Sequence, residues 1–117
     1  MQYVLLIYGD ETRFSPPSTP EDSRAMLEPW EKYTQWLTDE GLMKAGDALQ
    51  PTATATSVRV ENGEPLVTDG PFAETKEQLG GYYLIEADGL DTALEAAKKC
   101  PGAQGGTIEV RPVQVFD

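Results

Sequence analysis

Apolar residues along the chain follow two different periods, and these predict where strands and helices lie. Strand-like runs, rich in alternating apolar, β-branched and aromatic residues, cover Gln2–Tyr8, Met43–Leu49, Thr52–Val60, Pro65–Thr68, Gly81–Ala87 and Gly106–Val115. Helical spacing covers two segments, marked by Met26, Leu27, Trp30, Tyr33 and Leu37 and by Leu90, Ala93, Leu94 and Ala97. The order β-α-β-β-β-β-α-β predicts an α+β fold, a ferredoxin-like antiparallel sheet with two helices on one face.

Glycine, proline and asparagine residues mark the ends of these elements. Gly41 stands where a C-terminal cap would end the first helix. Pro29 falls inside the same helical pattern, lacks an N–H and clashes with the carbonyl four residues back. We therefore expect a kink or a restart there, which leaves a main helix over Pro29–Glu40. Asn62-Gly63 predicts a type I′ turn between two hairpin strands.

The first strand is apolar on both of its faces. Successive strand residues face opposite sides, yet Tyr3, Leu5 and Ile7 and the opposite set Val4, Leu6 and Tyr8 are all apolar or aromatic. Two helices cover only one face of such a sheet, so the other face needs a second sheet. The simplest source is another copy of the chain, and we expect a homodimer. The alternative is a monomer in which loops or the C-terminal tail cover this face.

The net charge and the amino-acid composition limit which ligands the protein can bind and which side chains can act in catalysis. The net charge is −11, and the nine Lys and Arg residues form no patch, which excludes direct binding of nucleic acid. The chain has no histidine, so the commonest general base and metal ligand are both missing. No calcium-loop motif or tight acidic cluster replaces it, and we predict no metal and no cofactor. The single cysteine, Cys100, is read as a small buried hydrophobe.

Length and hydropathy predict one cytoplasmic domain. A chain of 117 residues builds a single core, so we expect one domain over residues 1–117. No apolar run reaches the roughly 20 residues that a membrane span needs. The N-terminal segment also lacks the basic start and cleavage site of a signal peptide. We therefore expect no membrane association and a cytoplasmic location.

The segment 67–87 places a turn and many charges in front of an apolar strand. Pro71 cannot continue a strand ladder, so Asp69-Gly70-Pro71-Phe72 must turn. Asp69 suits a turn that accepts backbone N–H bonds, and we expect Phe72 to anchor in the core. The following residues, 74–78, are expected to form one exposed turn before the next strand. Taken alone, these residues favour a structural role over a functional one.

Several stretches together resemble one family. They are YVLLIYGDE, LQPTATATSVRV, TDGPFAETKEQLGGYYLIEA, DTALEAAKKCP and GTIEVRPV, which span nearly the whole chain. They resemble the YCII-related family, in particular the DGPF-domain branch named after its tetrapeptide. The resemblance implies a dimeric α+β barrel. It also implies an active-site pocket at the dimer's inner sheet surface, with Asp69 as the candidate acid or base.

Other polar residues could accompany Asp69. Glu109 and Arg111 lie two apart on the last strand, hence on the face opposite Ile108 and Val110. They either neutralise each other or line a wet pocket that holds a polar ligand. Tyr8 and Tyr82 lie near strand ends. Their hydroxyls could reach such a pocket, or the rings could serve as core or interface aromatics.

Two functions follow from these residues and the resemblance. The first is a small-molecule-binding or regulatory module, and the family's occurrence beside sigma factors implies an association with sigma-factor-dependent transcription. The alternative is a small cofactor-independent, lyase-like enzyme in which Asp69 moves a proton and Arg111 stabilises an anion. The family's proposed His-Asp pair is incomplete here, because no histidine is present.

Overall fold

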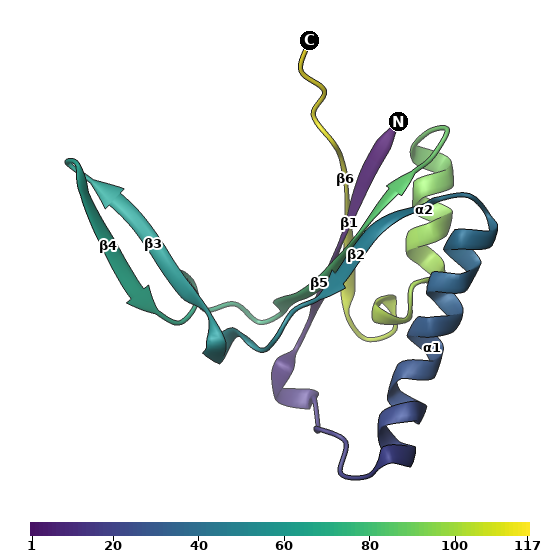
Figure 1. Ribbon diagram of the computed structural model, residues 1–117, viewed down its shortest axis with the longest axis horizontal. Coiled ribbons are helices and arrows are strands. Elements are labelled where there is room, and N and C mark those ends of the chain that lie inside the picture. Colours follow the sequence, from purple (N-terminus) through teal and green to yellow (C-terminus); the bar gives the residue numbers. More distant parts are fainter.

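The computed structural model describes residues 1–117 and contains two helices and two separate sheets. The main sheet consists of β1 (Gln2–Gly9), β2 (Met43–Ala48), β5 (Gln78–Glu86) and β6 (Thr107–Pro112), in the antiparallel order β2-β5-β1-β6. The helices are α1 (Pro20–Asp39) and α2 (Leu90–Lys99). Both cover the same face of this sheet (Figure 1). The predicted ferredoxin-like α+β fold is confirmed.

The core lies between the two helices and this covered face. The sheet contributes the buried side chains Tyr3, Leu5, Tyr83 and Ile85, and α1 contributes Tyr33 and Leu37. Helix α2 contributes three smaller side chains, Ala93, Ala96 and Ala97. The Tyr33 and Tyr83 rings meet edge to face at 5.3 Å. A glycine at position 46 is required beside them, because a Cβ there would lie 2.8 Å from Cδ1 of Tyr83.

Helix α1 is continuous, so the prediction of a main helix over Pro29–Glu40 is wrong. The helix begins at Pro20, where Thr19 acts as N-cap and its hydroxyl accepts the Asp22 N–H at 3.1 Å. Pro29 lies inside the helix and does not end it. The capping signal at Thr19 and the packing of the later turns outweigh the local cost of the proline.

The predicted helix end at Gly41 and the predicted hairpin turn are both confirmed. Gly41 has φ +72°, its N–H donates to the Thr38 carbonyl, and the Leu42 N–H donates to the Leu37 carbonyl. This pair of bonds is a Schellman cap. Asn62 and Gly63 have φ +51° and +79°, as a type I′ turn requires.

Two predicted strands were too long. Residues 52–54 form a 3₁₀ turn, so β3 begins only at Thr56. The last strand ends at Pro112 and does not continue to Val115. The final contact is the Val113 N–H to the Gln2 carbonyl at 2.9 Å, and β1 begins at Gln2, so no partner strand remains beyond it.

Strands β3 (Thr56–Glu61) and β4 (Glu64–Asp69) form a hairpin of their own, which we call the arm. The arm projects from the side of the main sheet that faces away from the helices (Figure 1). The radius of gyration is 16.4 Å, against about 13 Å for a compact chain of this length. Neither helix is both long and apolar enough to cross a membrane.

Candidate functional site

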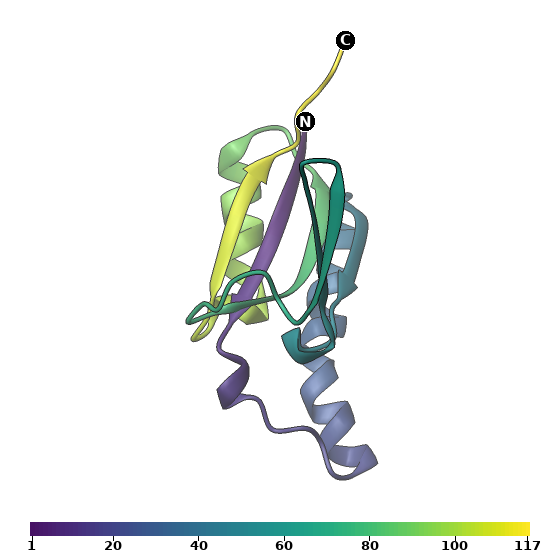
Figure 2. The same ribbon diagram turned by 90° about the vertical axis from the view of Figure 1, so that its left-hand side faces the viewer.

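The face of the main sheet opposite the helices, which we call the open face, is turned toward the viewer in Figure 2. Strand register places most of the predicted site residues on this face. Strand register places Val4, Leu6 and Tyr8 of β1 on this face, beside Leu84 and Tyr82 of β5. All five side chains are only half-buried. They form an apolar floor on which neighbouring strands place polar groups.

One polar group on this floor is a tyrosine-aspartate pair. Asp47 of β2 lies directly opposite Tyr82, and the Tyr82 hydroxyl donates to Asp47 Oδ2 at 2.7 Å. This hydrogen bond and the carboxylate charge raise the pKa of Tyr82, because ionisation would place two negative groups side by side. Asp47 was not among the predicted site residues. The sequence carried no signal for it, since only the pairing of β2 with β5 brings it to Tyr82.

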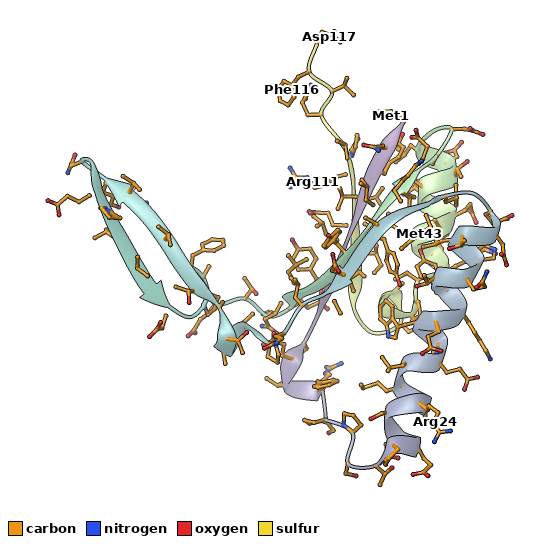
Figure 3. The ribbon with its side chains drawn as sticks, in the orientation of Figure 1. Met1, Arg24, Met43, Arg111, Phe116 and Asp117 are labelled. Carbon is orange, nitrogen blue, oxygen red and sulfur yellow. The ribbon has the colours of Figure 1, made fainter.

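Glu109 and Arg111 lie on the same face at its β6 edge. Glu109 is paired with Leu6 and Arg111 with Val4 in the β1–β6 register. Both side chains are exposed, and neither forms an ion pair within the chain. Arg111 points away from the helices, toward the side on which the arm projects (Figure 3). Its guanidinium is therefore free to hold an anionic group.

Asp69 stands apart from these residues. It is the last residue of β4, paired with Thr56 at the base of the arm, and it is exposed. Within one chain it is not on the main sheet that carries Tyr8, Tyr82, Glu109 and Arg111. Phe72 is 90% exposed, so the expected anchor in the core is wrong for the isolated chain. The turn that ends β4 has a left-handed backbone at Gly70, with φ +94°.

The loop that follows Asp69 is tied to the main sheet. The exposed turn predicted over residues 74–78 is confirmed only for 74–76, which are exposed and form no helix, because Glu77 and Gln78 are half-buried and Gln78 begins β5. The Thr107 hydroxyl donates to Oε1 of Glu77 at 2.7 Å. On the other side of the arm's base, Oε1 and Oε2 of Glu11 accept the Thr52 N–H and hydroxyl at 2.9 and 2.7 Å. These bonds tie the segments before and after the arm to residue 11, just beyond β1, and to β6.

Comparison with known proteins identifies a family match and a relative of this chain. Residues 1–117 match the YCII-related domain. The chain belongs to the YCII-related family. An uncharacterized protein of Rhizobium meliloti (strain 1021) is 40% identical over 118 residues, covering 99% of this chain and 94% of the relative. The family resemblance drawn from the sequence is thereby confirmed.

The open face of this YCII-related protein can bind and orient a ligand with the groups it holds. It offers one guanidinium, two carboxylates and two phenol hydroxyls around aliphatic side chains. No three His, Cys, Asp or Glu side chains gather where they could hold a metal ion. The chemistry available here is hydrogen bonding, ion pairing and proton transfer through carboxylates or phenols.

Proposed function

We propose that this YCII-related protein is a small-molecule-binding module whose ligand lies on the open face. The observation that carries the proposal is the unpaired Arg111 guanidinium beside a half-buried apolar floor, with Glu109 and the Tyr82–Asp47 pair on neighbouring strands. Ligand sites typically combine an apolar lining with a few convergent polar groups.

The groups on the open face favour a particular ligand chemistry. Arg111 suits a carboxylate, which its planar fork binds through two parallel hydrogen bonds. Glu109 and Asp47 are acceptors when ionised, so they suit hydroxyl or amino donors on the same molecule. The aliphatic floor suits a short carbon skeleton. The ligand class is therefore a small hydroxy or amino carboxylic acid.

A thermal-shift screen of small carboxylic acids, followed by calorimetric titration of those that stabilise the protein, tests this proposal. Arg111→Gln should weaken binding at least about tenfold, because a charge-assisted pair contributes about 1.5–3 kcal/mol. Arg24→Gln is the matched control, since Arg24 is exposed on α1, away from the open face (Figure 3). Absence of any binding acid, or equal loss in both variants, would contradict the proposal.

The regulatory part of the proposal concerns a protein partner. The support for a sigma-factor association is the family resemblance together with a net charge of −11, which suits a basic partner. If the protein binds a sigma factor, capture of that factor on the immobilised protein should be weakened by raised salt. Capture that is insensitive to salt would contradict an electrostatic association.

The lyase-like alternative depends on Asp69 as acid or base. A general acid or base must lie within hydrogen-bond reach of the group that it protonates or deprotonates. Asp69 is exposed, and within one chain it is not on the main sheet that carries Tyr82 and Arg111. The single chain therefore favours binding over proton transfer.

A further inference from the structure

A groove lies between α1 and the segment that ends α2, on the side of the molecule away from the arm (Figure 1). We call it the helix groove. Its volume is about 570 Å³, which is within the range of small-molecule pockets. Helix α1 contributes Pro29, Lys32, Tyr33 and Trp36, and the end of α2 with the turn that follows it contributes Lys99, Cys100, Pro101 and Gln104. No residue of the open face lines this groove, so the two surfaces are separate.

The floor of the helix groove is apolar. Tyr33 and Cys100 are buried there. The Tyr33 hydroxyl donates to the Ala96 carbonyl at 2.6 Å, so this polar group already has its partner. The rings of Tyr33 and Trp36 are nearly parallel, with 20° between their planes and 6.1 Å between their centroids. The groove therefore offers flat aromatic surface that suits a planar ring.

The charge of the helix groove is opposite to that of the whole chain. Both charged residues that line it are lysines, in a chain with nine Lys and Arg against 20 Asp and Glu residues. Lys32 pairs with Glu28 at 2.8 Å along α1. Lys99 forms no ion pair, and its Nζ lies 4.9 Å from the centroid of the Trp36 ring. The groove thus holds one cation that has no anionic partner.

The position of Lys99 has a second explanation, which its neighbour tests. Lys98 and Lys99 both belong to the last turn of α2, where cations stabilise a helix. Lys98 pairs with Glu95 at 2.9 Å and does not line the groove. Lys99 instead contacts the aromatic ring, and this contact restricts the ammonium group before any ligand arrives. Helix stabilisation alone does not account for that difference.

We propose that the helix groove is a second binding site, which takes a planar aromatic carboxylate. The ring packs against the apolar lining, and the carboxylate pairs with the Lys99 ammonium. No carboxylate lines the groove, so a cationic ligand would meet two ammonium groups and no counter-charge. The apolar floor favours an anion that carries a ring over a fully polar anion such as inorganic phosphate. The site is independent of the function proposed for the open face.

Calorimetric titration with two probes tests this site. Naphthaleneacetate and naphthaleneacetamide share one ring system and differ in charge. Wild type should bind the acetate at least about tenfold more tightly than the amide, because a charge-assisted contact is worth at least that factor. Lys99→Gln should remove this preference and leave the affinity for the amide unchanged. A wild type that binds neither probe, or that binds both equally, would overturn the proposal.

Lys98→Gln is the matched control. It removes the same charge from the same turn of α2, and it should leave the affinity for naphthaleneacetate unchanged. Both lysines are exposed, so circular dichroism should show both variants folded. Equal loss of affinity in Lys98→Gln and Lys99→Gln would assign the effect to the general charge of this helix end and would overturn the site.

The two tryptophans of the chain locate the bound probe. Trp36 lines the helix groove and Trp30 does not. In nuclear magnetic resonance spectra, the indole N–H signal of Trp36 should shift progressively as naphthaleneacetate is added. Trp30→Phe assigns the two signals, because it leaves only that of Trp36. Binding of the probe with an unmoved Trp36 signal would place it on another surface, such as the open face, and would overturn the proposal.

Discussion

The hydrogen bond from Tyr82 to Asp47 favours the protonated form of Tyr82. The two side chains come from adjacent strands and meet at 2.7 Å, and the pKa of Tyr82 is raised. A tyrosine held protonated can donate to a ligand oxygen only if Asp47 releases it. For the proposed ligand, Tyr82 would be a donor only after its bond to Asp47 is broken.

Replacing Asp47 should lower the pKa of Tyr82. Asp47→Asn removes the negative charge that opposes formation of the tyrosinate, so part of the tyrosinate absorbance should appear at lower pH than in wild type. The difference between wild type and Asp47→Asn should vanish in a Tyr82→Phe background. A shift that persists in that background would assign the effect to another tyrosine.

Replacing Asp69 should change ligand affinity more than stability. Asp69 is exposed at a strand end, and asparagine retains a side-chain acceptor, so Asp69→Asn should cost at most about 1 kcal/mol of unfolding free energy. If Asp69 takes part in the ligand site, as the family resemblance implies, affinity for the carboxylic acid should change when this side chain loses its charge. Urea denaturation and calorimetry measure the two effects. A destabilised variant with unchanged affinity would confine Asp69 to a structural role.

At the scale of elements, the termini of α1 are set by local chemistry and its interior by packing. Thr19 caps the start and Gly41 permits the left-handed backbone at the end. Tyr33 and Leu37 are buried against the sheet between them. This explains why Pro29 is tolerated inside the helix: the residues around it are held by the cap and the core.

The cap at Gly41 gives an element-scale prediction. Gly41→Ala forces a side chain into φ +72°, although a Cβ there would meet no other atom, so the cost comes from the backbone alone. Unfolding free energy in urea should fall by about 1 kcal/mol. Gly9→Ala is the control, because position 9 also has free space and does not have a positive φ. Equal effects of the two changes would argue against the cap.

At the scale of the whole molecule, the core is small and contains ionisable groups. The Tyr33 hydroxyl is buried and donates to the Ala96 carbonyl at 2.6 Å, and Cys100 is buried beside it in the same cluster. Burial raises the pKa of Tyr33, Tyr83 and Cys100, because the charged forms are poorly solvated there. Because of these groups, the stability of the folded state depends on pH in the alkaline range.

Stability should therefore fall on the alkaline side. The ordinary pKa values are 9.0 for the thiol and 10.0 for the phenols, and the folded values are higher. The folded state binds more protons, so its stability is intact below these ordinary values and is lost as pH rises through the folded ones. Melting temperature measured across this range should decline, and Tyr33→Phe should make the decline shallower. An unchanged slope in Tyr33→Phe would contradict this assignment.

The sequence by itself determined the order of the elements, the ferredoxin-like plan and the family. Period-two and helical spacing report which side of an element is buried, and Gly41 and Asn62-Gly63 act through their own backbone angles. Tertiary structure decided what depends on residues distant in sequence. It fixed the meeting of Asp47 with Tyr82, the continuity of α1 through Pro29, and the separation of Asp69 from Arg111. The pairing of strands and the direction of the arm decide which of these residues meet. Both depend on contacts between residues far apart in the sequence, so no local pattern predicts them.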